Sequence, residues 1–170
     1  MNSLPSQHES LADERPRIRP MVPEEARAVA GLINEAFIVE AFFKIGDRTS
    51  AHEVIRLTGD GEFLVLEEPR GTIAGCVYLT FHGGRAYFGM LSIAPSRQGR
   101  GLGRRLIDAV EARARGRGCL AVDIHIVNLR EELPDFYRRL GYVESGTLPF
   151  SDADRASRPC HFIVMTKTLV

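Results

Sequence analysis

Residues 91–114 read "LSIAPSRQGRGLGRRLIDAVEARA", a strand-like run, a glycine-rich turn and a helix-like run in direct succession. From Leu102 onward the apolar residues recur with helical spacing. The first amides of such a helix lack internal acceptors, and the helix dipole adds partial positive charge there. Gly99, Gly101 and Gly103 remove the Cβ atoms that would hold an anion away from the backbone. The stretch therefore predicts an anion site at the start of a helix.

Four arginines add positive charge to the same turn: Arg97, Arg100, Arg104 and Arg105. Each exposed amide or dipole contributes only about 0.3–1 kcal/mol, so several must converge on one multiply charged group, such as a diphosphate. A dinucleotide-binding GxGxxG turn is excluded because Arg104 takes its last position. A Walker loop is excluded because no lysine lies between Lys44 and Lys167.

The remaining pattern predicts a β-α-α-β-β-β-α-β-α-β-β order, an α+β fold with a mixed, mostly antiparallel sheet and about four helices on its faces. Three consecutive strands with tight turns form a meander. The helix before residues 119–127 makes that strand a parallel neighbour of residues 85–93, joined by a right-handed crossover. The expected strands are 17–21, 62–68, 72–81, 85–93, 119–127, 142–150 and 160–169, and the expected helices begin near residues 23, 51, 102 and 134.

Length and composition set bounds on the function. The 170 residues fit one domain over 16–170, preceded by a polar, flexible tail over 1–15. The formal net charge of zero disfavours nucleic acid as a partner. No apolar run is long enough for a membrane span or a signal peptide, which predicts a cytoplasmic protein without a membrane partner. The three cysteines have no metal-ligand spacing, so no metal is expected.

The glycine-rich turn resembles the acetyl-CoA motif of the GCN5-related N-acetyltransferase (GNAT) family. That motif is Arg or Gln, any two residues, Gly, any one residue, then Gly or Ala, and Gln98, Gly101 and Gly103 fill it. A second family motif is matched by "IVNLREELPDFYRRLGY", in which Asn128 follows a strand and Tyr137 lies in an FYxxxGY run. The element order is similar to the family fold over roughly residues 17–169, which implies a GNAT-like fold and acetyl-CoA as cosubstrate.

The resemblance implies specific roles. The pyrophosphate of acetyl-CoA would lie on the amides from Gln98 to Arg104, and Tyr137 would be the general acid. The pantetheine arm would run along residues 89–93, and Asn128 either contacts this arm or forms a strand-end turn. The implied cofactor-binding residues are Leu91, Ser92, Ile93, Gln98, Gly99, Arg100, Gly101, Leu102, Gly103, Arg104 and Asn128.

The general base is less well defined by the sequence. Asp123 and His125 share one face of their strand. His125 is a candidate base because its ordinary pKa lies near neutrality, and the alternative is that the two side chains satisfy each other or nearby backbone groups. In the helix that begins at Pro134, Phe136 is expected to face the core and Tyr137 to lie at a different angle. Further candidate bases are Glu40, Glu62 and Glu67.

By the same resemblance, the acceptor would enter between residues 36–50 and 147–161. Phe37, Phe42 and Phe43 are candidate substrate-binding residues. Asp152 and Asp154 would hold a cationic amine, whereas Lys44, Arg48, Arg155 and Arg158 would pair with an acceptor's carboxylate, and the sequence does not choose between them.

The resulting hypothesis is an N-acetyltransferase that moves an acetyl group directly from acetyl-CoA to a primary amine of a small molecule or peptide. The alternative is a non-catalytic acyl-CoA-binding or regulatory module of the same fold. Members of this family are often homodimers, although no feature of the sequence specifies an interface.

Overall fold

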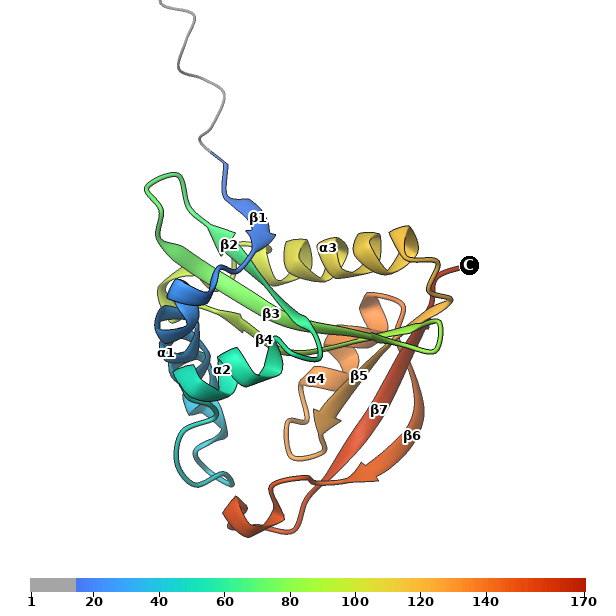
Figure 1. Ribbon diagram of the computed structural model, residues 1–170. Helices are drawn as coiled ribbons and strands as arrows, with labels where there is room; N and C mark the ends of the chain where they lie inside the picture. The colour runs from blue at the N-terminus through green and yellow to red at the C-terminus, as the bar shows by residue number, and fades with distance from the viewer. Residues whose placement is uncertain (1–14) are drawn as a thin grey trace, which may run out of the picture.

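The computed structural model describes residues 15–170, in which seven strands form one twisted sheet that fans apart (Figure 1). The sheet order is β1-β2-β3-β4-β5-β7-β6, and every pair is antiparallel except β4–β5. The strands are β1 (Arg17–Pro20), β2 (Glu62–Glu67), β3 (Ile73–His82), β4 (Arg85–Ile93), β5 (Ala121–Val127), β6 (Val143–Pro149) and β7 (His161–Thr168).

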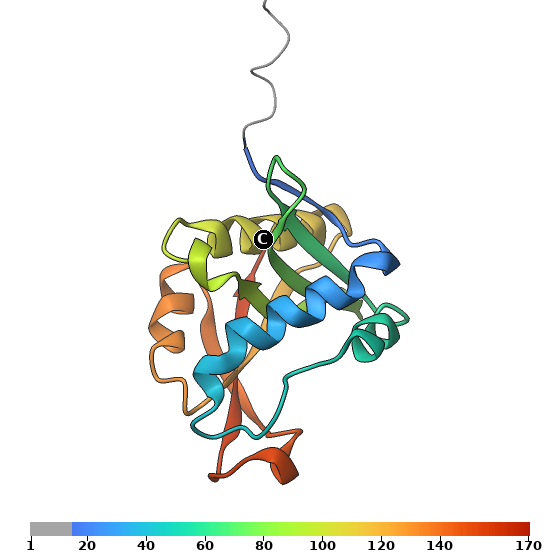
Figure 2. The same ribbon diagram turned by 90° about the vertical axis from the view of Figure 1, so that its left-hand side faces the viewer.

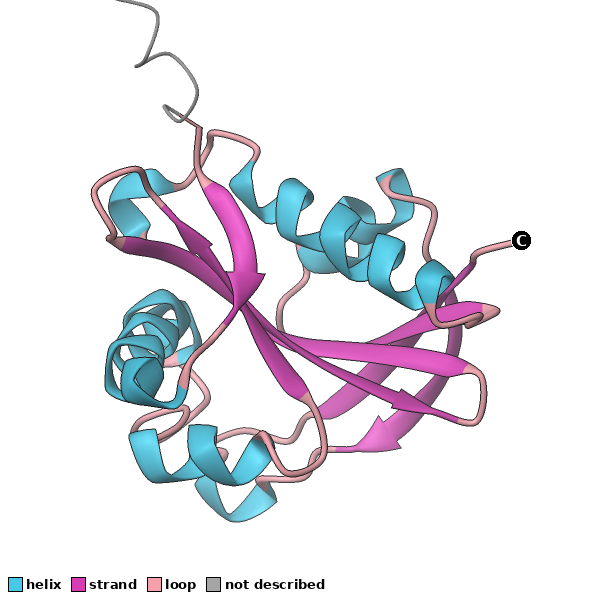
Figure 3. Ribbon diagram, turned by 45° about the horizontal axis from the view of Figure 1, so that its top comes forward, coloured by secondary structure: helices cyan, strands magenta, loops and turns pink. Residues whose placement is uncertain are grey.

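Helices cover both faces of the sheet, α1 and α2 on one face and α3 and α4 on the other (Figure 3). The α-helices are α1 (Ala26–Ala36), α2 (Ala51–Leu57), α3 (Leu102–Gly116) and α4 (Leu133–Arg139). Short 3-10 turns are η1 (Pro23–Glu25), η2 (Phe37–Glu40), η3 (Pro95–Arg97) and η4 (Ala153–Arg155).

The alternation of side chains along β2 explains why the sheet has a core on each face. Leu64 and Leu66 pack toward α3, whereas Phe63 and Val65 pack toward α1 and α2, and all four are buried. Side chains two residues apart on a strand share a face, so an uninterrupted apolar run serves both layers. Each such burial contributes about 1.5–3 kcal/mol, which holds the two helix layers to one central strand.

Strands β4 and β5 separate soon after they pair. Their parallel ladder covers only Arg85–Tyr87 against Ala121–Asp123. Further along β4 the register with β3 shifts between Cys76 and Tyr78, and Met90 adopts a φ of +52°. A bulge of this kind bends its strand and increases the local twist. Beyond Tyr87, therefore, β4 and β5 diverge and leave a wedge between them (Figure 1).

Both lysines of the chain are engaged in ion pairs. Lys44 is buried and pairs with Asp152 at 3.0 Å. Lys167 donates to both carboxylate oxygens of buried Glu111, at 3.0 and 2.9 Å, and Tyr142 donates to the same carboxylate at 3.1 Å. Burial of Glu111 is tolerated because several donors satisfy its charge, and this network ties α3 to β7.

The structure confirms the predicted fold, including the parallel β4–β5 pair. The expected tail over 1–15 lies outside the described residues except for Arg15, and the single-domain prediction remains untested.

The expectation for α4 was wrong in one respect, because Phe136 is 37% exposed whereas Tyr137 is 8% exposed. The helix turns Tyr137 toward Phe88 and Tyr142 in the core. None of the described helices combines the length and apolarity that a bilayer crossing requires.

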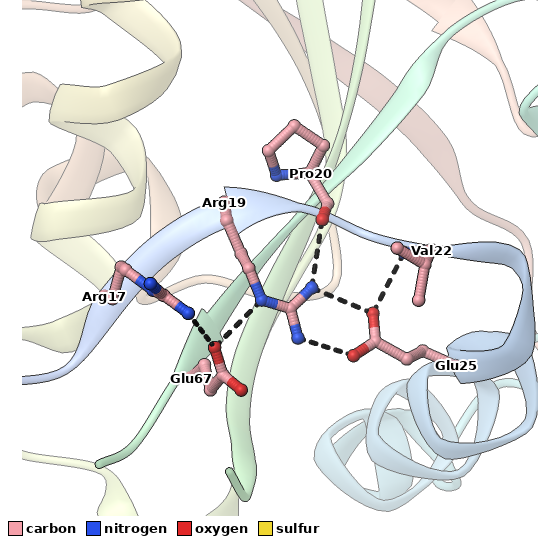
Figure 4. Close-up of polar contacts among 6 residues, drawn as sticks. All are labelled: Arg17, Arg19, Pro20, Val22, Glu25 and Glu67. Carbon is pink, nitrogen blue, oxygen red and sulfur yellow. Dashed lines mark hydrogen bonds and ion pairs between the residues drawn. The ribbon is translucent and has the colours of Figure 1, made fainter.

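An ion network at the start of the sheet accounts for Glu67, one of the candidate bases. Arg19 lies between two carboxylates, donating to Glu67 at 2.9 Å and to Glu25, while Arg17 donates to Glu67 at 3.0 Å (Figure 4). These two guanidinium groups lower the pKa of Glu67 to about 2. Glu67 therefore joins β2 to β1, and Arg19 extends the network to Glu25 of η1, so Glu67 has a structural explanation.

We expect this network to add acid-sensitive stability. The folded pKa of Glu67 is depressed, so its stabilising effect is fully present above pH ~4.5 and is lost as the pH falls toward 2. Glu67→Gln should therefore narrow the difference in urea midpoint between pH 6 and pH 3. Glu24→Gln, which removes an exposed carboxylate without an ion pair among the described residues, is the control. If the urea midpoints of Glu67→Gln at pH 6 and pH 3 differ as much as those of the wild type, Glu67 does not contribute to the acid sensitivity.

Candidate functional site

The turn before α3 presents a row of free amides. Gly99 and Gly101 have φ values of +77° and +75°, a region that glycine enters without strain. The first backbone bond of α3 runs from Arg105 N to Gly101 O at 3.2 Å. Within the described residues, the N–H groups from Gly99 to Arg104 donate to no backbone or side-chain acceptor. Six successive unpaired donors at the start of a 15-residue helix suit a multiply charged anion.

The arginines of this turn divide into two groups. Arg97 forms an ion pair with Glu68, and Arg105 donates to the carbonyl of Pro16 at 2.8 Å. Arg100 and Arg104 are exposed and form no ion pair with the residues that the structure describes. The space beside the glycines of the turn is open, because a Cβ atom added at Gly99 or Gly101 would have no other atom within 4 Å. The cradle is thus open to a ligand rather than closed by its own side chains.

A groove of about 460 Å³ extends from this turn. Its lining comes from the end of α1, from β4, from the turn itself and from the segment before and within α4. Figure 2 shows these segments near one another on the side of the molecule that faces the viewer. Most of the predicted cofactor-binding residues line it: Leu91, Ser92, Ile93, Gln98, Gly99, Gly101, Leu102, Gly103 and Arg104. Gln98 also donates to the carbonyl of Ile93 at 3.1 Å, which fixes the start of the turn.

A second cavity, of about 190 Å³, fills the wedge between β4 and β5. It is lined by residues 87–91 of β4 and 124–127 of β5, and it includes Tyr137 and His125. The groove and this cavity share part of their lining, namely Phe37, Leu91, Arg130, Leu133 and Phe136. They therefore adjoin, and one elongated molecule on the turn can reach the wedge.

Arg130, Leu133 and Phe136 were not predicted as site residues. They belong to the second family motif, just after Asn128, and this proximity was the available signal. Arg130 forms ion pairs with Glu40 at 3.2 Å and with Glu132 at 2.7 Å. Phe136 lies edge-on to Tyr137, with ring centroids 5.0 Å apart. These residues form the wall between the groove and the cavity.

Tyr137 presents an unusual combination of a buried ring and an unused hydroxyl. Its ring packs against those of Phe88 and Tyr142, with centroids 6.3 and 5.7 Å away. Among residues 15–170 no group forms a hydrogen bond with its hydroxyl. Burial raises the pKa of Tyr137 well above its ordinary value, while the positive charge of Arg130 acts in the opposite direction. The phenol is thus protonated at neutral pH and faces the cavity without a protein acceptor.

His125 and Asp123 do not satisfy each other. Asp123 accepts from Arg85 at 2.7 and 2.6 Å and from Thr166 at 2.6 Å. The His125 ring instead lies 4.7 Å from the ring of Tyr87 and 5.8 Å from that of Phe162. Partial desolvation beside these rings lowers the pKa of His125 below its ordinary 6.5 although the residue is still exposed to solvent, and the charge of Asp123 only partly opposes this. The imidazole is therefore neutral at pH 7.

Asn128 and the phenylalanines occupy different settings. The Asn128 side chain accepts from the His161 amide at 2.8 Å, so it fastens the end of β5 to β7. Phe37 lines both the groove and the cavity. Phe43 is fully buried in a small core with Phe150, whereas Phe42 is 45% exposed.

The two remaining glutamates that were candidates for the general base, Glu62 and Glu40, lie in different places. Glu62 receives two hydrogen bonds from Arg113, both 2.8 Å, and it lines neither the groove nor the cavity. Glu40 lines the cavity, but it is buried against Arg130. Among the described residues no three His, Cys, Asp or Glu side chains are grouped as metal ligands.

The two segments expected at the acceptor entrance are joined to each other, next to Arg48 and Phe150 of the cavity lining. Lys44 and Ala156 form a β-bridge, Ile45 N donates to Arg155 O at 2.8 Å, and Ser157 N donates to Phe43 O at 2.7 Å. The Lys44–Asp152 ion pair adds to this connection. We call residues 43–47 and 152–157 together the strap.

Comparison with known proteins places this geometry in a family. A family model described as an acetyltransferase (GNAT) domain matches residues 59–144. Glucosamine 6-phosphate N-acetyltransferase 1 of Oryza sativa subsp. japonica is 31% identical over 137 residues, which make up 75% of this chain and 81% of that protein.

Solved structures agree in fold. Ard1 from Thermoplasma volcanium superposes with a TM-score of 0.76 at 17% identity, covering 91% of this chain and 98% of that one. The ribosomal-protein-S18-alanine N-acetyltransferase from Escherichia coli gives 0.74 at 16% identity, covering 91% and 94%. The chain therefore belongs to the GNAT acetyltransferase family, which confirms the predicted family and the predicted class of enzyme, an N-acetyltransferase.

The setting of His125 generates a titration prediction. We expect its imidazole to titrate below pH 6.5 because burial disfavours the charged form. Asp123→Asn should lower that pKa further, since it removes the negative charge that favours imidazolium. An NMR titration of the ring protons measures both values, with Asp108→Asn on the exposed side of α3 as the control. A pKa at or above 6.5 would contradict the partial desolvation of the ring.

Proposed function

We propose that this protein transfers the acetyl group of acetyl-CoA to a primary amine of a small molecule, with Tyr137 as the general acid. One observation carries the proposal. The groove that begins at six unpaired amides shares a wall with the cavity that contains a protonated, unpartnered phenol. A diphosphate on the turn and a thioester beside Tyr137 are two parts of one coenzyme, separated by its pantetheine arm.

The residues of the groove fit coenzyme A. The amides of Gly99 to Arg104 would hold the pyrophosphate, and exposed Arg100 and Arg104 would add charge. Leu91 to Ile93 would bind the pantetheine arm, because β4 beyond Tyr87 has no strand partner on its β5 side. The bound cosubstrate supplies an activated acetyl thioester.

Tyr137 would donate a hydrogen bond and then a proton to the departing sulfur. Its raised pKa keeps the proton on the oxygen at neutral pH. The resting phenol is a weaker acid than an ordinary tyrosine, so it would release the proton only as negative charge develops beside it. The positive charge of Arg130 partly offsets the effect of burial on the pKa of Tyr137, and so makes the phenol easier to deprotonate than burial alone would.

His125 is the proposed base, acting directly or through water. Its neutral imidazole lines the same cavity as Tyr137 and has a lone pair available at pH 7. Transfer requires a neutral amine, and a base with a lowered pKa can take the amine proton only when the attack on the thioester has begun. Glu40 is a less suitable base because Arg130 holds its carboxylate.

The strap supports a small acceptor over a peptide. Two backbone hydrogen bonds and an ion pair join residues 43–47 to 152–157, beside Arg48 and Phe150 of the cavity lining, and would restrict access for a long chain. A peptide would need an open groove, whereas a cavity of about 190 Å³ suits a small molecule. The rice relative is named for a small amine, glucosamine 6-phosphate, and Phe37 would contact the acceptor from α1's end of the cavity.

The alternative, a non-catalytic acyl-CoA-binding module, gives a different result in a direct test. Purified protein, acetyl-CoA and a broad panel of amines should release CoA thiol with at least one amine. Binding of acetyl-CoA without thiol release across the panel would favour the module. The division into a tail over 1–15 and one domain over 16–170 remains a proposal, to be tested by limited proteolysis.

Gly101→Asp tests the pyrophosphate site. A carboxylate at this exposed turn would oppose the pyrophosphate, so we expect CoA affinity to fall by about a hundredfold or more, measured by calorimetry. Gly101→Asn is the matched control, since it has the same shape and backbone demands without the charge. Equal affinity of the Asp and Asn variants would remove the turn from the anion site.

Tyr137→Phe tests the general acid. We expect kcat to fall by about a hundredfold or more, with CoA affinity unchanged, because only proton donation is lost. Tyr142→Phe is the control: it removes a neighbouring buried hydroxyl that bonds Glu111, so it should lower thermal stability and leave kcat unaffected. Wild-type turnover in Tyr137→Phe would exclude its role.

A further inference from the structure

Arg48 stands apart from the other cations near the acceptor entrance. Lys44 pairs with Asp152, and Arg155 donates to the carbonyls of Ile45 and Asp47 at 3.2 and 2.7 Å. Arg158 is exposed and lies over the ring of Phe42, outside the cavity. Arg48 alone among these four lines the cavity that contains Tyr137 and His125.

The guanidinium of Arg48 has donors that the protein does not use. In the described part of the chain Arg48 forms no hydrogen bond and no ion pair, and its Nε is buried without a partner. The guanidinium instead makes a cation–π contact with the Phe37 ring, whose centroid lies 4.9 Å from Cζ. Buried donors in folded proteins are nearly always paired, so this group lacks an acceptor that a ligand can supply.

The position of Arg48 is fixed by the backbone beside it. Asn34 on α1 donates to Thr49 O and accepts from Thr49 N, both at 2.9 Å. Ser50 then caps α2 through the amide of Glu53. A ligand-binding arginine held in this way loses little conformational freedom when it binds.

The charge of the cavity favours an anion at Arg48. Glu40 and Glu132 neutralise Arg130, and His125 is neutral. Among the described residues that line the cavity, Arg48 is therefore a cation whose charge no ion pair balances. That charge also acts on its neighbours, since it contributes to lowering the pKa of Lys44 and opposes the effect of burial on the pKa of Tyr87. A planar guanidinium matches the oxygens of a carboxylate or phosphate.

We infer that the acceptor is a small primary amine that also bears a carboxylate or phosphate, and that Arg48 binds this anionic group. The inference rests on the proposed acetyl transfer and narrows its acceptor. An oxyanion held at Arg48 anchors one end of the molecule within the wedge, which leaves the amine free to approach His125 and the acetyl group. Arg48 is thus a residue that determines specificity.

Matched probe pairs test the inference. Glucosamine 6-phosphate is compared with glucosamine to test a phosphate. A set of amino acids is compared with the corresponding amino acid carboxamides to test a carboxylate. Binding to the full-length protein saturated with CoA is measured by calorimetry, and acetylation by thiol release from acetyl-CoA. We expect the anionic member of at least one pair to bind about ten- to hundredfold more tightly and to have the higher kcat/KM.

Arg48→Met should abolish that preference, so that the two members of each pair bind with equal affinity, whatever its effect on the affinity that they share. Arg48→Lys should retain part of it, since charge remains without the guanidinium fork. Arg70→Met, which removes an exposed arginine from the β2–β3 turn, is the control for charge, and thermal unfolding checks that each variant folds.

Two results would overturn the inference while acetyl transfer itself stands. In one, neutral amines are bound and acetylated as well as their anionic partners. In the other, Arg48→Met weakens both members of a pair equally, as expected if Arg48 only packs on Phe37. A protein that binds CoA but acetylates no amine in any arm would instead refute the proposed function, and the inference with it.

Discussion

The separation of β4 from β5 is the constraint on which the site depends. Parallel pairing ends at Tyr87 and Asp123, and the bulge around Met90 turns β4 away from its neighbour. A fully paired sheet would fill this space with backbone hydrogen bonds. Because the ladder stops, the wedge has an unpaired strand edge on one side and the neutral ring of His125 on the other. The start of α3 lies at its open end, so anion site and cavity adjoin.

Much of the fold could be predicted from local patterns. The alternation through residues 62–93, the glycine-rich turn and the helical spacing after Leu102 each report a short-range preference of the backbone. The sequence also indicated the β4–β5 pair, because a helix between two strands favours parallel pairing. What it did not indicate was the length of that ladder. A bulge depends on how Cys76 and Tyr78 register with the opposite strand, and no local pattern encodes that.

The site divides in the same way. The anion turn is contiguous in sequence, so its residues could be named in advance. Phe136 was assigned to the core because spacing alone does not show which side of α4 meets the sheet. A pairing of Asp123 with His125 was one of the alternatives that the sequence left open, but Arg85 and Thr166, which are distant in sequence, provide the partners of Asp123. Arg48 was one of four equivalent cations until the contacts of the other three were known: Lys44 has an ion pair, Arg155 has backbone carbonyls, and Arg158 has the Phe42 ring. Partner choice is a tertiary property, and it decides which charges remain for a ligand.

The ion pairs of Lys44 and Lys167 have a further consequence for a protein that works beside a reactive thioester. Acetyl-CoA can modify any accessible, uncharged lysine amine without catalysis, yet these are the only lysines in the chain. The Lys44 side chain is 4% exposed and bound to Asp152, and Lys167 is held by Glu111. Arginine, which stays protonated, supplies the remaining basic residues. Within residues 15–170, therefore, neither lysine amine is freely available for self-acylation.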